Sequence, residues 1–249
     1  MSNGQTGPAS VPPSGGPVDH AVLDDLAAAS RILADQGVFD SAGHCSMRHP
    51  SAPDRFLMSR SLAPALVQPD DIMEFALDCV ACEQRGRNGF LERYLHGEIY
   101  KARPDVMAIA HSHSAAVIPF GLVQTPMVAT YHNAAFLAAG VPVFDIREKF
   151  GTTDIVVSTP EKGAALAEVL ADKPVALLRA HGVVVVGPSL RSAVFRAVFT
   201  EVSARIQLQA AMLGGPIAAL DAEEGRLADA VNLATDTRAW ELWKRRVTR

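Results

Sequence analysis

Three histidines in this chain stand where apolar segments end and small residues begin. His111 and His113 follow the apolar run 106–110 with one serine between them, and His181 precedes a glycine. On a β-strand, residues i and i+2 point to the same face and lie about 6.6 Å apart. Two imidazoles at that spacing can bind one cation through bonds of about 2.0–2.1 Å, and a third histidine still leaves a coordination position open. The pattern therefore predicts a catalytic site with one divalent metal ion, for which zinc, manganese, iron and cobalt are equally suitable.

A carboxylate is also needed to move protons beside such an ion, and Glu92 is the best-placed candidate. It lies at the start of the segment 91–103, whose pattern predicts a helix that ends before Pro104. As a first-turn acid, Glu92 could instead only stabilise the helix dipole. His96 lies at position i+4 on the same helical face, so it could orient Glu92 or simply pack in the core.

The elements that must position these residues alternate along the chain. Apolar periodicity, capping residues and turn residues predict helices over 18–37, 91–103, 114–120, 133–140, 161–170 and 189–213, and one or two more within 225–247. Beyond a first hairpin that begins in 41–50, strands are expected over 55–59, 72–77, 106–113, 126–130, 141–145, 155–158, 175–178 and 183–186. The alternation shows no internal repeat and no domain boundary. It predicts one α/β domain, a three-layer α/β/α sandwich around a mixed sheet.

Composition excludes several classes of protein. The 249 residues are 49% hydrophobic and 20% charged, with a net charge of −4, which argues against nucleic-acid binding. Because no apolar run reaches the ~18 residues that span a bilayer, no membrane partner is expected. Residues 1–18 are rich in glycine and proline without an apolar stretch, so we expect a flexible tail before a domain over 19–249, with no signal peptide and a cytoplasmic location.

Two of the three cysteines form a Cys-x-x-Cys pattern, Cys79 to Cys82. The surrounding segment, 75–86, has the pattern of a strand, a turn and a strand, whereas a redox pair is expected at the start of a helix. A zinc site of this type would need a second pair, which the sequence lacks. We therefore assign these cysteines no catalytic role.

The order and spacing of Glu92, His111-Ser-His113 and the segment 177–182 are similar to those of the class II aldolase/adducin-head family, from about Leu23 to about Gln209. In that family three histidines bind a divalent ion and a glutamate acts as acid and base. The resemblance implies His111, His113 and His181 as metal ligands and Glu92 as proton carrier. It also implies a mostly antiparallel sheet, one metal ion per subunit and a homotetramer with active sites at subunit interfaces.

The chain departs from the sugar-phosphate members of the family in the elements that bind phosphate. Where those members carry small donor groups, this chain has Gly43-His44, Ser59-Arg60-Ser61 and Gly89-Phe90-Leu91. A phosphate would lose its small donors here. Arg60 offers a planar fork suited to a carboxylate, and Phe90 would form a flat apolar wall. A planar carboxylated substrate is therefore favoured over a sugar phosphate.

Segments 43–50, 56–64, 71–75 and the pair Tyr131-His132 look like the decarboxylases of this fold, which act on 3,4-dihydroxyphthalate, 2-hydroxy-3-carboxymuconic semialdehyde or a hydroxypyridine dicarboxylate. The resemblance implies a metal-dependent decarboxylase of a small carboxylate, in which the ion stabilises the negative charge left by bond cleavage. Glu92 and His132 are competing proton donors. The substrate contacts implied are Arg60, His44, Ser59, Phe90 and Tyr131.

Other interpretations remain open. Arg60 could be only the partner of a structural ion pair, and His44 or His132 could only bridge loops. An aldolase or epimerase acting on a hydroxylated carbonyl compound is the alternative activity. A non-catalytic, adducin-like interaction module is a third interpretation, but it predicts degraded histidines, and all three are present together with Glu92.

Overall fold

The computed structural model describes residues 11–248. Its helices are α1 His20–Asp35, α2 Arg93–Ala102, α3 Arg147–Phe150, α4 Pro160–Leu170, α5 Leu190–Leu213, α6 Ala222–Thr235 and α7 Thr237–Val247. Its strands are β1 His44–Arg48, β2 Arg55–Ser59, β3 Ile72–Ala76, β4 Ala108–Ser112, β5 Val143–Phe144, β6 Val175–Leu178 and β7 Gly182–Gly187. Short 3-10 helices are η1 Pro64–Leu66, η2 Pro69–Asp71, η3 Ile118–Gly121 and η4 His132–Ala139.

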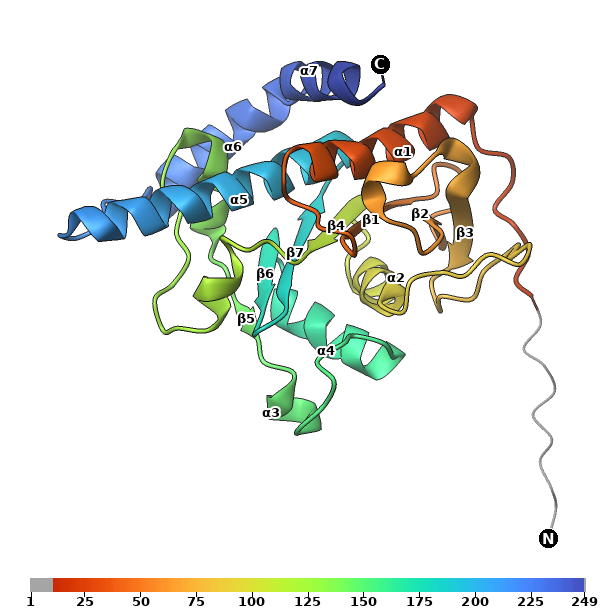
Figure 1. Ribbon diagram of the computed structural model, residues 1–249, viewed down its shortest axis with the longest axis horizontal. Coiled ribbons are helices and arrows are strands. Elements are labelled where there is room, and N and C mark those ends of the chain that lie inside the picture. The colour runs from red at the N-terminus through yellow and green to blue at the C-terminus, as the bar shows by residue number, and fades with distance from the viewer. Residues whose placement is uncertain (1–10, 249) are drawn as a thin grey trace, which may run out of the picture.

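The strands form one seven-stranded sheet in the order β3-β2-β1-β4-β7-β6-β5 (Figure 1). All neighbouring strands are antiparallel except β5 and β6. The predicted mixed, mostly antiparallel sheet is thus confirmed. The central position of β4, between β1 and β7, places its polar end beside both neighbours. In that register His44 of β1 pairs with His111 of β4.

Helices cover both faces of the sheet, as the three-layer prediction requires. Figure 1 shows α1 and α5 on one side of the strands and α2 and α4 on the other. Strand β7 displays both layers, because Val183 and Val185 pack under α1 and α5 whereas Val184 and Val186 pack under α2 and α4. An unbroken run of valines is what a strand buried on both faces needs.

Local signals begin the helices close to where the sequence predicts. The side chain of Asp19 accepts from Ala21 N–H before α1, and Thr159 caps α4 with Pro160 in its first turn. Ser189 caps α5 in the same way, by accepting from Ser192 N–H. Such caps satisfy backbone donors that have no partner inside the helix.

Several predicted elements are wrong. Segments 126–130 and 155–158 contain no strand. The first is bound by side chains of α5, since Val128 N–H donates to Gln207 Oε1. Segments 114–120 and 133–140 contain 3-10 helices in place of α-helices. The one or two helices expected within 225–247 are confirmed as two, the first of which begins at Ala222.

The ends and the cysteines complete the description. Residues 1–10 of the predicted tail lie outside the described residues, and further along the tail Gly15 N–H donates to the side chain of Glu74 in β3. Cys79 and Cys82 are buried and free. Within residues 11–248, no helix has both the length and the apolar character that crossing a bilayer demands.

Candidate metal site and its cavity

The pairing of β4 with β7 brings the three predicted histidines together. His111 lies at the end of β4 and His113 just beyond it, while His181 stands in the turn from β6 to β7. Gly182 is needed in this turn, because a β-carbon there would collide with the carbonyl oxygen of Ser112. The backbone of β7 can therefore approach β4 closely enough for His181 to face the other two imidazoles.

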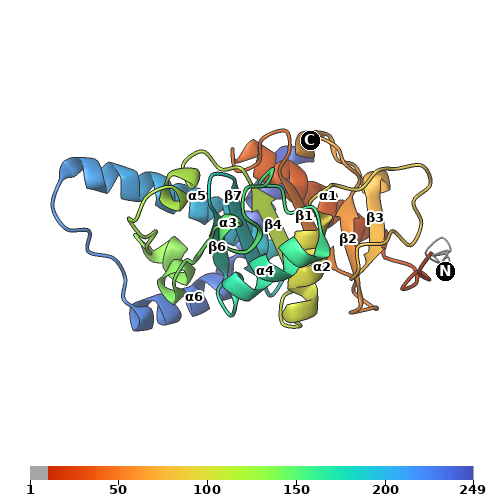
Figure 2. The same cartoon turned by 90° about the horizontal axis from the view of Figure 1, so that it is seen from below.

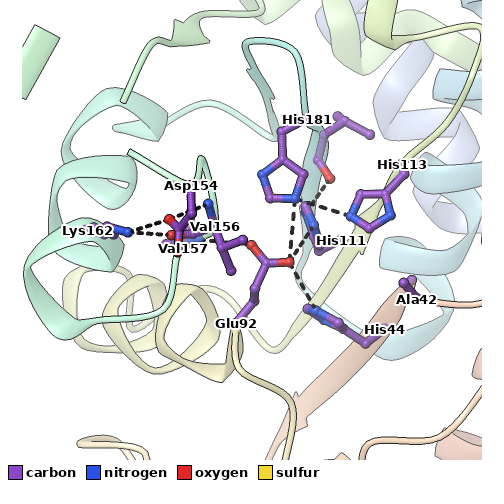
Figure 3. A network of polar contacts seen from close by, with 12 residues as sticks. Ala42, His44, Glu92, His111, His113, Asp154, Val156, Val157, Lys162 and His181 are labelled. Atoms are coloured by element: carbon purple, nitrogen blue, oxygen red, sulfur yellow. Dashed lines mark hydrogen bonds and ion pairs between the residues drawn. The ribbon is translucent and has the colours of Figure 1, made fainter. Parts of the chain in front are cut away.

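The ligand atoms of His111, His113, His181 and Glu92 all lie within 4.8 Å of one another. His181 Nε2 is 3.2 Å from His113 Nε2, and Glu92 Oε2 is 3.4 Å from His111 Nε2 and 3.5 Å from His181 Nε2 (Figure 3). Donors bound to one tetrahedral zinc ion at about 2.0–2.1 Å are separated by about 3.3 Å. The cluster therefore has the spacing to hold one divalent ion.

The outer nitrogens of two ligands are occupied, which directs their inner nitrogens to the centre. His111 Nδ1 lies 3.1 Å from the carbonyl oxygen of Val183, and His113 Nδ1 lies 3.1 Å from Asp40 Oδ2. His111 Nε2, in contrast, is buried and has no hydrogen-bond partner among residues 11–248. A buried nitrogen without a partner is costly unless a ligand satisfies it, so the donor set fits a metal ion.

Glu92 immediately precedes α2, but its side chain does not cap the helix. Its Oε1 accepts from Val157 N–H at 3.0 Å, which leaves Oε2 facing the histidines (Figure 3). Burial by itself raises the pKa of Glu92, but the imidazoles of His111 and His181 outweigh burial and hold this pKa well below its usual range. The geometry thus supports an ionised carboxylate at the centre more than a helix-dipole role.

A loop that the sequence did not point to holds Glu92 in place. In segment 153–157, Ile155 has a φ of +59°, which is strained for a β-branched residue. Lys162 Nζ, in the first turn of α4, lies 3.0 Å from Asp154 Oδ1 and 2.9 Å from the carbonyl oxygen of Val156 (Figure 3). Lys162 therefore fixes the loop whose Val157 N–H binds the carboxylate.

A cavity of about 350 Å³ adjoins Glu92. Its lining includes two predicted substrate contacts, His44 and Phe90, whose ring centroids are 4.6 Å apart. Leu62 and Val156 add further apolar surface. A cavity lined by an aromatic ring and aliphatic side chains beside a carboxylate suits a planar apolar ring more than a sugar phosphate.

The other predicted contacts do not line this cavity. Ser59 is buried in β2. Arg60 pairs with Asp71 through Nε and Oδ1 at 2.6 Å and directly precedes Ser61, a cavity residue. Tyr131 has a buried hydroxyl that makes no hydrogen bond within the part of the chain that the structure describes.

His132 lies in a separate hollow beside α5, α6 and α7. Its carbonyl oxygen accepts from Asn232 at 2.8 Å. One chain therefore does not bring His132 to the cavity beside Glu92.

Comparison with known proteins defines the class. Residues 24–208 match the family described as Class II Aldolase and Adducin N-terminal domain, and the chain belongs to this family. The L-fuculose 1-phosphate aldolase from Glaciozyma antarctica has a similar structure, with a TM-score of 0.75, 22% identity and 94% coverage of both chains.

Among relatives of known activity, the chain is similar to decarboxylases. Decarboxylase tropJ from Talaromyces stipitatus is 33% identical over 239 residues, which cover 87% of this chain and 90% of that protein. The 3,4-dihydroxyphthalate decarboxylase from Arthrobacter keyseri is 29% identical over 241 residues, with 90% and 93% coverage. The chain thus matches the decarboxylase branch of its family, which supports a lyase.

Proposed function

We propose that this protein is a divalent-metal-dependent decarboxylase of a planar, hydroxylated aromatic or muconate-type carboxylate, such as 3,4-dihydroxyphthalate. One observation carries the proposal: a cluster of three histidines and an ionised glutamate adjoins a cavity walled by Phe90 and apolar side chains. The similarity to two decarboxylases supports the same reaction class.

His111, His113 and His181 would hold the ion, and zinc, manganese, iron and cobalt all suit three imidazoles. When bound, such an ion supplies a Lewis acid that stabilises the negative charge left by carbon–carbon bond cleavage, by several kcal/mol. Glu92, ionised in the free site, would first accept a proton from a hydroxyl of the substrate and then return it to the carbon that loses CO₂. Such a transfer contributes about 10²–10⁴-fold to the rate.

The remaining residues would bind and orient the substrate. Phe90 would pack against its ring, and His44, whose own ring contacts Phe90, would face its oxygens. Arg60 would hold the carboxylate that is retained: Asp71 occupies its Nε, while its terminal nitrogens make no hydrogen bond within the described part of the chain. Ser59 would support this end of β2.

His132, with Tyr131 directly before it, would act in a homotetramer with interfacial active sites, from one subunit into the site of the next. Support comes from the position of His132 outside its own chain's cavity. His132 would then be the proton donor that competes with Glu92.

The decisive experiment incubates the metal-reconstituted protein with a small panel of ortho-hydroxy aromatic dicarboxylates and records CO₂ release. We expect CO₂ from at least one of them, and none after the metal is removed by a chelator. Release of an aldehyde from a hydroxylated carbonyl compound, without CO₂ from any dicarboxylate, would support the aldolase alternative. A protein that purifies without metal and turns over neither class would support the interaction module.

The variant Glu92→Gln tests the proton carrier. It should keep the metal content of the wild type and lose about 10²–10⁴-fold in kcat, because an amide cannot carry the proton. Glu98→Gln on the same helix, where Glu98 only pairs with Lys101 at 2.6 Å, is the matched control. Full activity of Glu92→Gln would remove Glu92 from the reaction.

A further inference from the structure

A chain of four buried polar side chains runs from the core to the cavity. Tyr100 OH lies 2.8 Å from Ser46 Oγ, which lies 2.7 Å from His96 Nδ1, and His96 Nε2 lies 2.8 Å from His44 Nδ1. None of the four is more than 2% exposed. We call these residues the buried polar chain.

The direction of the hydrogen bonds follows from the far end of the chain. Tyr100 OH has one partner among the described residues, Ser46 Oγ. Since a buried hydroxyl that donates to nothing is costly, Tyr100 donates to Ser46. Ser46 has only one proton, and it therefore donates to His96 Nδ1.

The same reasoning carries the proton positions to the cavity. His96 accepts at Nδ1, so its proton is on Nε2 and is donated to His44 Nδ1. His44 then accepts at Nδ1 and carries its own proton on Nε2. The reverse order would leave the hydroxyl proton of Tyr100 without an acceptor.

The surroundings of the chain keep it neutral. Burial lowers the pKa of His96 to about 3, so this imidazole is uncharged near neutral pH. The nearest cation, Arg48, lies over the Tyr100 ring at 4.7 Å, and its nitrogens donate to backbone carbonyl oxygens. Arg48 has no acceptor atom for the Tyr100 hydroxyl, so it does not change which residue of the buried polar chain donates to which.

At the cavity end, the Nε2–H of His44 has no hydrogen-bond partner within residues 11–248. Its nearest acceptor is Glu92 Oε2, at 4.0 Å, which is beyond hydrogen-bond distance. His44 and Glu92 both line the cavity. A donor fixed in this way is suited to an oxygen of a bound ligand.

We propose that Tyr100, Ser46 and His96 are positioning residues that fix His44 as an Nε2–H donor, and that His44 binds a carboxylate or ionised hydroxyl oxygen of the substrate without accepting a proton. The identity of that oxygen rests on the proposed function. The direction of the chain does not, so the two can fail separately.

Nitrogen-15 NMR of the zinc-loaded, histidine-labelled protein tests the direction of the chain. In the wild type we expect His44 to have a protonated Nε2 and an unprotonated Nδ1, and Tyr100→Phe should shift both nitrogens toward averaged values. Tyr94→Phe is the matched control, since Tyr94 lies on the same helix and its hydroxyl contacts only Arg93. A protonated Nδ1 in the wild type, or an unchanged spectrum in Tyr100→Phe, would overturn the proposal.

Steady-state kinetics with the carboxylate that releases CO₂ tests the role of His44. His44→Ala should raise KM about tenfold or more, as expected for a lost hydrogen bond to a charged group, and His44→Gln, which keeps an N–H donor, should recover part of that loss in KM. An equal, large loss of kcat in both variants would show that His44 accepts a proton, against the proposal. A wild type that releases no CO₂ but has the expected His44 tautomer would overturn the proposed function and support the positioning chain.

Discussion

The three imidazoles of the candidate metal site differ in what holds them. His111 is oriented by a backbone carbonyl oxygen and His113 by the carboxylate of Asp40. His181 Nδ1 is buried and finds no hydrogen-bond partner among the described residues. A carboxylate partner makes an imidazole a stronger ligand, so the side chain of Asp40 is the outer contact through which metal affinity can be changed without touching a ligand.

We expect Asp40→Asn to weaken metal binding about 10–100-fold. Asparagine keeps the oxygen that accepts from the N–H groups of Ala42 and Gly43, but it puts an amide, which cannot accept, opposite His113 Nδ1. Competition with a chromophoric chelator measures the affinity.

The matched control for this change is Asp24→Asn. Asp24 also pairs with a histidine, His20, at 3.0 Å, but both side chains are exposed on α1. Equal metal affinity in Asp40→Asn and the wild type would show that the carboxylate does not tune His113.

The candidate site was predictable where residue type and local pattern coincide. His111, His113 and His181 could be found because each stands at the end of an apolar strand beside a small residue. Asp40 and the N–H of Val157 gave no such signal, because loops far apart in the sequence bring them to the site. A backbone donor has no residue type that marks it.

At the scale of elements, the same distinction separates the strands that were predicted from those that were not. Segments 55–59, 175–178 and 183–186 have a local apolar pattern, and all three contain strands. Segments 126–130 and 155–158 have similar residues but form no strand within residues 11–248, since side chains of α5 and Glu92 bind N–H groups there and Ile155 has a positive φ. A segment whose N–H groups bind side chains and one whose N–H groups bind a neighbouring strand look alike in sequence.

Helix α4 contributes to the site through one side chain, Lys162. Its two contacts, to Asp154 and Val156, hold a loop strained at Ile155. We expect Lys162→Met to lower kcat about tenfold with unchanged metal content, because Glu92 loses a fixed donor on Oε1 and a misplaced catalytic group costs rate.

Steady-state kinetics and metal analysis check this expectation. Lys149→Met is the matched control, since Lys149 of α3 also pairs with a carboxylate at α4, that of Glu168, at 3.2 Å on the surface. Wild-type kcat in Lys162→Met would mean that Glu92 keeps its orientation without the loop.

At the scale of the whole molecule, several large apolar side chains are exposed on the surface of the chain. The last turn of α5 extends beyond the sheet (Figure 2), and Met212 and Leu213 there are 86% and 89% exposed. Leu122 and Val123, on the loop after η3, are also more than half exposed. Burial of these side chains against another subunit would favour the association proposed above.

Mixing two variants with reduced activity tests whether His132 acts across a subunit boundary. We expect Glu92→Gln and His132→Ala to be at least about tenfold slower than the wild type when each is alone. In a 1:1 co-assembled tetramer, half of the chains carry an intact Glu92 and half an intact His132, so about a quarter of interfacial sites regain both groups.

The matched control mixes Glu92→Gln with the double variant, in which no chain retains Glu92, and it should show no recovery. Absence of recovery in the first mixture would show that His132 does not act across a subunit boundary. Full activity of His132→Ala alone would remove His132 from proton transfer.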